Sequence, residues 1–206
     1  MIIRKSAQEI ASFKGTEAAI VYTSGYVTNV STVGALAKEG DIISFDIGVT
    51  KDGLIADSCA TFPVGEISDE AQRLIDTCKA ALEAGIEAAQ VGAFVGDISA
   101  AVQQTVEEAG FSVVRSLVGH GVGRSYHEDP QIPNYGPAGK GPLLGEGMTL
   151  AIEPMITAGR PEVYVHDDDW SISSVDESLA AHFEHTVAIT AGGPRILTKA
   201  GAALLH

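Results

Sequence analysis

Four carboxylates and one histidine stand in sequence settings where they could bind metal. Asp46 and Asp57 lie on neighbouring strand candidates, Glu153 and Glu184 lie within apolar runs, and His120 lies between glycines. Acidic side chains are rarely buried unless they are paired or bound to a metal. Carboxylate oxygens with one imidazole suit hard or borderline divalent cations such as Mn, Fe, Co or Zn. Because one cation does not need four acids, the set indicates two cations about 3.5–4 Å apart, bridged by carboxylates.

The pairing of two strands decides whether Asp46 and Asp57 meet. Alternating apolar residues predict one strand over 41–49 and another over 54–64, joined by a tight turn centred on residues 51–52. In that register Asp46 falls directly opposite Asp57, with Cβ atoms about 4.5–5.5 Å apart. Two like charges so placed destabilise a sheet unless a cation or a raised pKa on one acid neutralises them. In the alternative, the register slips by one residue and both acids face water.

Glycines flank His120 in the segment Gly119-His120-Gly121-Val122-Gly123. They let backbone and ligand approach closely. Such a segment could be mistaken for a phosphate-binding loop. No apolar helical period follows it over residues 124–130, so we reject a dinucleotide site.

Composition narrows the classes of function further. The chain has 206 residues, with 13 basic against 27 acidic side chains and a formal charge of −14. No nucleic-acid partner is expected, because phosphate binding requires a basic face. The 45% hydrophobic content predicts a folded chain of a length that suits one domain. Without an apparent signal peptide or membrane span, we expect a cytoplasmic protein with no membrane association and with free thiols at Cys59 and Cys78.

The remaining segments predict the elements that position these groups. Residues 18–47 indicate strand, helix and strand, the first strand covering 18–23. Ser68 and Asp97 are candidate N-caps of two helices that end before Gly92 and Gly110. Short strands are expected over 112–118, 148–156, 162–166 and 183–190. Strands around one pair of helices predict an α+β fold with helices on one face of the sheet.

Eight short motifs keep a distinctive order and separation. They are Phe45-Asp46-Ile47-Gly48-Val49, Asp52-Gly53, Asp57-Ser58, Thr61-Phe62, Gly119-His120-Gly121-Val122-Gly123, His127-Glu128-Asp129-Pro130, Glu153-Pro154 and Phe183-Glu184-His185-Thr186. Together, over residues 41–197, they resemble the type I methionine aminopeptidases of bacteria. The resemblance implies a pita-bread fold whose N-terminal portion is shortened or replaced. We expect a single catalytic-type domain, 1–206, made of an atypical front segment, 1–43, and an aminopeptidase-like portion, 44–206.

The resemblance also assigns roles in a dinuclear metal centre. Two divalent ions, Co, Mn, Fe or Zn, would be bound by Asp46, Asp57, His120, Glu153 and Glu184. Asp57 and Glu184 would bridge them, and Glu153 would also act as the general base for attack by a metal-activated hydroxide. The implied reaction removes the N-terminal methionine of peptides or nascent chains.

Three further residues are expected near the substrate. The resemblance implies that His127 contacts the scissile peptide and that Trp170 lines the substrate side. Tyr126 precedes His127, which leaves open whether it forms a wall of the pocket or only packs. Three other histidines, His166, His182 and His206, receive no role.

His185 and Cys59 neighbour expected ligands. His185 directly follows Glu184 and would point to the opposite face of the strand, so a structural role is expected. Cys59 shares the face of Asp57. A thiol ligand fits neither the oxygen-rich set nor the family, so we do not expect Cys59 to bind metal.

The front segment resembles a different family. Residues 13–26, Phe-Lys-Gly-Thr-Glu-Ala-Ala-Ile-Val-Tyr-Thr-Ser-Gly-Tyr, are similar to an internal piece of the pyridoxal-phosphate α-oxoamine synthases, and the likeness extends over about residues 7–43. The rest of that family's site, including its Schiff-base lysine region, is absent, so no pyridoxal phosphate is expected. The two likenesses meet near residues 41–45, which favours a chimera; a divergent short aminopeptidase is the alternative.

This front segment also bears on activity and assembly. It contains no histidine, whereas the corresponding part of the aminopeptidases supplies one that contacts substrate. A non-catalytic chimera or relic, which keeps the fold, with or without the metals, but has an incomplete pocket, is therefore the second hypothesis. A replaced front would expose apolar surface, which predicts a possible homodimer.

Overall fold

The computed structural model describes residues 2–22, 24–169 and 171–199. The chain divides into two compact units, Met1–Glu39 and Gly40–His206, and each is described by itself. No helix within the described ranges is long and apolar enough to cross a lipid bilayer.

The front unit contains two helices, α1 (Ile2–Lys14) and α2 (Gly25–Leu36). The helix expected after Ser24 is confirmed, and the Ser24 side chain caps it by accepting a hydrogen bond from the backbone nitrogen of Val27. The strand expected over 18–23 is wrong: residues 18–22 have no regular structure, and Thr23 lies outside the described residues. The described part of this unit contains no other strand with which residues 18–22 could pair. An isolated strand would leave its backbone groups without hydrogen-bond partners, so the strand does not form.

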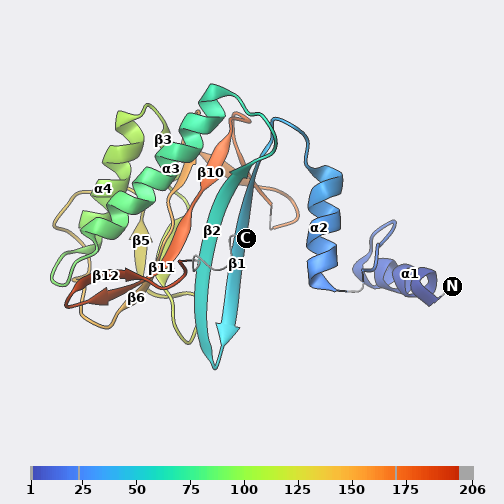
Figure 1. Cartoon of the computed structure of the whole chain (residues 1–206), viewed down its shortest axis with the longest axis horizontal. Helices are drawn as coiled ribbons and strands as arrows, with labels where there is room; N and C mark the ends of the chain where they lie inside the picture. The colour runs from blue at the N-terminus through green and yellow to red at the C-terminus, as the bar shows by residue number, and fades with distance from the viewer. Residues whose placement is uncertain (1, 23, 170, 200–206) are drawn as a thin grey trace. The chain divides into compact units, whose positions relative to one another are not determined.

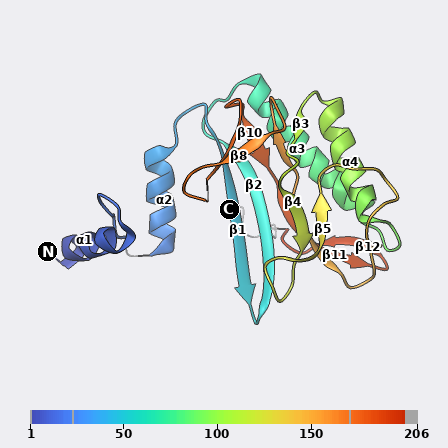
Figure 2. The same cartoon turned by 180° about the vertical axis from the view of Figure 1, so that it is seen from behind.

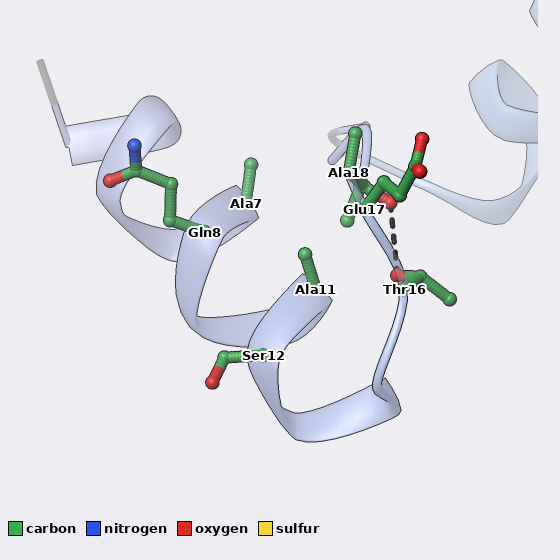
Figure 3. A pocket seen from close by; sticks show the side chains of 8 residues that line it. Ala7, Gln8, Ala11, Ser12, Thr16, Glu17 and Ala18 are labelled. Atoms are coloured by element: carbon green, nitrogen blue, oxygen red, sulfur yellow. Dashed lines mark hydrogen bonds between the residues drawn. The ribbon is translucent and has the colours of Figure 1, made fainter.

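A hollow of about 480 Å³ lies between α1 and residues 16–19 (Figure 3). Its lining consists mostly of alanine and small polar side chains. Thr16 closes the turn beside it by donating a hydrogen bond of 3.0 Å to the carbonyl oxygen of Ala18. No group of metal-ligating side chains is found there among the described residues.

The second unit is built on a seven-stranded sheet in the order β1-β2-β11-β6-β4-β5, with β12 also paired to β11. Its strands are β1 (Ile42–Lys51), β2 (Leu54–Pro63), β4 (Val118–Gly121), β5 (Glu128–Pro133), β6 (Thr149–Ile152), β11 (Glu184–Thr190) and β12 (Gly193–Ile196). Two smaller sheets contain β10 (Ala180–His182), β7 (Met155–Thr157) and β3 (Ser112–Val113), and β8 (Val163–Val165) with β9 (Ile172–Ser174). The strand expected over 148–156 is thus two strands, β6 and β7, separated by Glu153 and Pro154; a proline cannot donate to a ladder.

Two helices, α3 (Asp69–Ala88) and α4 (Val95–Glu108), lie on one face of this sheet (Figure 1). The hydroxyl of Ser68 caps α3 as expected. The apolar sides of both helices pack on sheet residues such as Leu150, Ile152 and Val187 to form the core. Figure 2 shows the sheet from its other side, away from the two helices. The predicted α+β arrangement is confirmed.

The hairpin between β1 and β2 turns one residue later than expected. Lys51 pairs with Leu54, so Asp52 and Gly53 form a two-residue turn. Their φ angles are 53° and 76°. A tight turn with two positive φ angles favours the sequence Asp-Gly, and this preference decides against a turn centred on 51–52.

The register therefore differs by two residues from the predicted one. Asp46 pairs with Cys59, and Asp57 pairs with Gly48. The prediction that Asp46 lies directly opposite Asp57 is wrong. A shift of two residues preserves the alternation of side chains, so both acids still lie on one face of the sheet.

Candidate metal centre

One cavity of about 340 Å³ contains all the predicted metal ligands. Its lining is formed by Asp46, Asp57, Leu117, Val118, His120, Tyr126, His127, Glu153, Met155, His182 and Glu184. The five expected ligands, His127 and Tyr126 are thus brought together from segments far apart in sequence. Trp170 lies outside the described residues.

Three adjacent strands place a row of side chains on the cavity face. Cys59 in β2 pairs with Asp46 in β1 on one side and with Glu184 in β11 on the other. Paired residues of neighbouring strands project to the same face of a sheet. Asp57, two residues from Cys59, shares this face.

His120 enters from β4, next to β6. It pairs with Ala151, two residues before Glu153. A Cβ at Gly119 would collide with the carbonyl oxygen of Ala151, so this glycine is needed for the close approach of the two strands. The expectation that glycines beside His120 let other backbone approach closely is confirmed: the backbone of β6 lies against Gly119.

One hydrogen bond of the His120 ring leaves its Nε2 atom available to bind a metal ion. Its Nδ1 lies 2.9 Å from the carbonyl oxygen of Gly121, which can only accept, so Nδ1 carries the proton. In the neutral ring Nε2 then has a free lone pair. This nitrogen lies 3.3 Å from Oε1 of Glu153. Two acceptors at that distance repel each other unless a proton or a cation is shared with them.

Hydrogen bonds on several sides hold Asp57. Its backbone nitrogen donates to Oγ1 of Thr186, and the same hydroxyl donates to the Asp57 carbonyl oxygen, both at 2.8 Å. Since one hydroxyl serves both groups, Thr186 ties β11 to β2 at this point. The hydroxyl of Tyr126 donates to Oδ1 of the Asp57 carboxylate at 3.0 Å.

Glu184 is the most deeply buried acid of the group, with 1% of its surface exposed. Its Oε1 has no hydrogen-bond partner among the described residues. Burial, followed by the charges of Glu153, Asp57 and Asp46, raises the pKa of Glu184 to about 9. Burying such a group without a partner is costly. A bound cation would remove that cost.

The donor set fits a divalent metal. Asp57, His120 and Glu184 can each place one ligand atom within 4.8 Å of the other two. Asp46 extends the acidic surface of the cavity, and its pKa is raised, chiefly because its carboxyl group is partly desolvated by the surrounding chain. Oxygen donors with one imidazole suit the borderline divalent ions of the first transition row.

His182 is a member of the cavity that the sequence interpretation left without a role. It ends β10, and its Nε2 lies 3.5 Å from Oε2 of Glu153. The sequence does contain one sign of its place in the site: His182 lies two residues before Glu184, and in an extended chain residues two apart project to the same face.

Tyr126 and His127 are exposed residues at the rim of the cavity, next to the buried His120. The ring centroids of His120 and His127 lie 4.4 Å apart in an edge arrangement. Burial and the bond to Asp57 raise the pKa of Tyr126, which keeps it a neutral donor. His185 lies on the other face, as expected, where its Nδ1 is 2.8 Å from Oγ1 of Thr198.

The chain matches the metallopeptidase family M24 over residues 3–191. It belongs to this family. Methionine aminopeptidase 1 of Bacillus subtilis is 51% identical over 162 residues, which cover 79% of this chain and 65% of that protein. Methionine aminopeptidase 1 of Mycobacterium tuberculosis is 44% identical over 174 residues, 82% of this chain and 65% of that protein. The chain thus spans less than two thirds of the length of these curated M24 relatives.

Two solved structures share the fold. Methionine aminopeptidase from Thermotoga maritima is 50% identical, with a TM-score of 0.78 over 79% of this chain and 66% of that chain. Prolidase from Pyrococcus furiosus is 26% identical, with a TM-score of 0.61 over 80% of this chain and 43% of that one. These similarities establish the predicted pita-bread fold.

Proposed function

We propose that this chain is a metal-dependent aminopeptidase that removes methionine from the N-termini of peptides or nascent chains. The observation that carries the proposal is the convergence of five metal-ligand side chains in one cavity of an M24 chain. The relatives that are about half identical are methionine aminopeptidases, which supports the same substrate class.

Asp46, Asp57, His120, Glu153 and Glu184 would hold two divalent cations, with Asp57 and Glu184 between them. When bound, such a pair lowers the pKa of a water and polarises the scissile carbonyl.

Glu153 is placed to move the proton. Its two carboxylate oxygens lie 3.3 Å from Nε2 of His120 and 3.5 Å from Nε2 of His182. It would accept a proton from the attacking water and pass it to the leaving amine, which is the role of a general base that becomes a general acid. His127, on the rim, would bind the scissile peptide, and the acidic cavity would attract the N-terminal ammonium of the substrate.

A second cavity supports an apolar first residue in the substrate. It has a volume of about 170 Å³, and its lining includes Val163, Ile156 and Ala181. It shares Leu117, Met155 and His182 with the acidic cavity. An apolar side chain such as that of methionine would bind here while its amine stays near the acids.

The front segment leaves the non-catalytic chimera or relic as the competing proposal. No histidine occurs before His120. The similarity to methionine aminopeptidase 1 of Bacillus subtilis covers 79% of this chain, so part of the chain lies outside it. The similarity of residues 7–43 to α-oxoamine synthases stays a prediction.

Release of methionine from a Met-Gly peptide, with Co or Mn added, tests the proposal. We expect turnover in the wild type and a loss of at least about 100-fold in Glu153→Gln, a typical effect for a general base. Glu162→Gln is the matched control, because Glu162 is exposed and pairs with Arg160. Binding of metal without turnover would favour the non-catalytic alternative, and turnover unaffected by Glu153→Gln would contradict the proposed base.

A further inference from the structure

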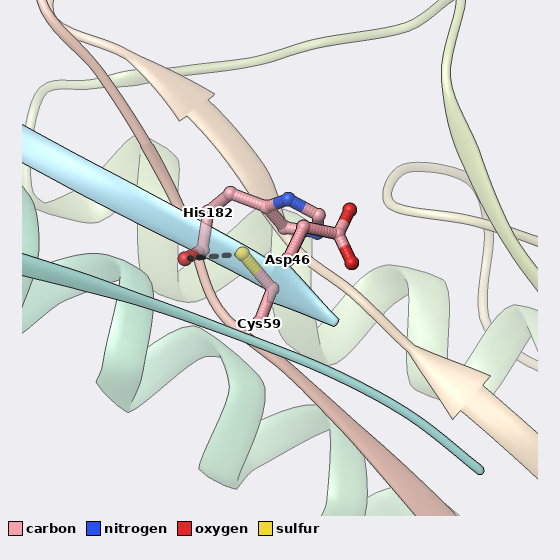
Figure 4. Close-up of side chains that lie close together, drawn as sticks. All are labelled: Asp46, Cys59 and His182. Atoms are coloured by element: carbon pink, nitrogen blue, oxygen red, sulfur yellow. Dashed lines mark hydrogen bonds between the residues drawn. The ribbon is translucent and has the colours of Figure 1, made fainter. Parts of the chain in front are cut away.

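A second group of metal-ligating side chains adjoins the oxygen-rich set. Asp46, Cys59 and His182 can each place one ligand atom within 4.8 Å of the other two (Figure 4). The group adjoins the first set on the same face of the sheet, because Cys59 pairs with Glu184 and lies two residues from Asp57 along β2. The structure thus offers two neighbouring groups of three donors.

Contrary to the expectation from the sequence that Cys59 does not bind metal, we propose that Cys59 and His182 are further ligands of the cation held by Asp46, which makes that position a mixed sulfur, nitrogen and oxygen site. The inference deepens the proposed function, since it concerns the same metal centre. Thiolate and imidazole ligands favour Zn or Co over the harder Mn and Mg. This second position should therefore select a more thiophilic ion than the position formed by Asp57, His120 and Glu184.

The separations allow such a site. Zinc bonds of about 2.0–2.3 Å to nitrogen, oxygen and sulfur place tetrahedral ligands about 3.3–3.8 Å apart. Since the three donors already lie within 4.8 Å of one another, they need to close by about 1 Å. Asp46 is exposed, so its side chain is free to make part of this movement by rotation.

The hydrogen bonds of Cys59 and His182 also leave their ligand atoms available to bind a metal ion. His182 Nε2 is buried and makes no hydrogen bond in the described part of the chain, although Oε2 of Glu153 lies 3.5 Å away, whereas buried polar atoms are ordinarily hydrogen-bonded. Cys59 is only 4% exposed, and its thiol contacts the carbonyl oxygen of His182 at 3.6 Å. On coordination the S–H bond breaks, its proton leaves to solvent, and the sulfur lone pair forms the bond to the cation.

The second cysteine provides a matched control. Cys78 lies in α3, is fully buried, and its thiol contacts the carbonyl oxygens of Pro154 and Ala181. It is absent from both groups of candidate ligands. A signal that depends on Cys59 and not on Cys78 therefore reports the proposed site rather than thiol content.

Titration of the metal-free full-length chain with Co²⁺, under reducing conditions, tests the inference by absorption. A thiolate ligand gives a sulfur-to-cobalt charge-transfer band in the near ultraviolet. We expect this band in the wild type and in Cys78→Ser, and its loss in Cys59→Ser. His182→Gln should raise the cobalt concentration needed for the band by at least about tenfold, the size of effect seen when even an outer partner of a ligand is lost.

The outcomes separate this inference from the proposed function. Cobalt binding without a thiolate band in the wild type, or a band that persists in Cys59→Ser, would overturn the mixed-ligand site and leave the oxygen-rich centre intact. Failure to bind cobalt at all would overturn both. X-ray absorption of the zinc-loaded wild type gives a readout that needs no variant: sulfur in the first coordination shell supports the inference, and only oxygen and nitrogen there contradicts it.

Discussion

The hydroxyl of Tyr126 donates a hydrogen bond of 3.0 Å to Oδ1 of Asp57. The phenol ring reaches this position over Gly48, the residue that pairs with Asp57 across the hairpin. A Cβ at Gly48 would collide with the ring of Tyr126. The orientation of one expected metal ligand thus depends on the absence of a side chain in the neighbouring strand.

Gly48→Ala should displace Tyr126 and weaken metal binding by about 10–100-fold, the usual effect of losing a partner that orients a ligand. Isothermal titration with Mn²⁺ measures this affinity. Tyr126→Phe, which removes only the hydroxyl, should cause part of the loss. If Gly48→Ala lowers affinity equally in a Tyr126→Ala background, the collision is not the cause.

The alternation of side chains alone predicts which face of the sheet carries the acids, whereas their partners depend also on the position of the turn. Alternation over β1 and β2 places Asp46 and Asp57 on one face in any register that preserves parity. The position of the turn decides which residues pair, because moving the centre of the turn by one residue shifts every pairing partner by two. The positive φ angles of Asp52 and Gly53 decide it, and the Asp-Gly pair was the sequence signal for this turn.

Two other elements show what local pattern cannot predict. The apolar run over 18–23 had the composition of a strand, but a strand requires a neighbour, and local sequence does not report one. The family resemblance implies no role for His182, and its spacing from Glu184 places the two side chains on one face only if the chain stays extended, whereas His182 ends β10 and Glu184 begins β11. Only the folded chain shows that both strand ends project into one cavity.

The raised pKa of Glu184 predicts how pH affects the stability of the metal-free chain. Its ordinary value is 4.5, and burial with the nearby carboxylates raises it to about 9. Between these values the folded chain holds a proton that the unfolded chain releases, so the free energy of unfolding should fall as pH rises from about 5 to 9. Thermal unfolding measured across this range in the presence of chelator checks the slope.

Glu184→Gln should flatten that pH dependence, while Glu162→Gln, at an exposed position, should leave it unchanged. Added Mn²⁺ should also reduce the slope, because a cation favours the ionised carboxylate. A slope that remains in Glu184→Gln would show that another group controls stability in this pH range.

The apolar cavity beside the acids predicts substrate selectivity. Val163 contributes to its lining and is only partly exposed. Val163→Phe should fill part of the 170 Å³ volume and raise the KM for a Met-Gly peptide by about 10-fold, since a steric change in an apolar pocket costs about 1–3 kcal/mol. Cobalt affinity should not change. An unaltered KM would place the methionine side chain elsewhere.

The hairpin has an exposed apolar strip on the face opposite the acids. Phe45, Ile47 and Val49 in β1 and Phe62 in β2 are all exposed, and β1 ends the strand order of its sheet. Contiguous apolar surface and an edge strand both favour association. We therefore expect the proposed homodimer, and Ile47→Lys should shift it towards a monomer of 21.4 kDa.

Light scattering coupled to size-exclusion chromatography measures this shift. Val91→Lys is a matched control, because Val91 is an exposed apolar residue outside the hairpin. A monomeric wild type, or equal effects of the two lysines, would contradict a role of the strip in assembly.

If side chains from separate strands hold two cations in one cavity, as we propose, the purified chain should bind two metal ions. After equilibrium dialysis against Co²⁺, elemental analysis should give two ions per wild-type chain and fewer in both Asp46→Asn and Glu184→Gln. An unchanged metal content in both variants, or no bound metal in the wild type, would contradict the account.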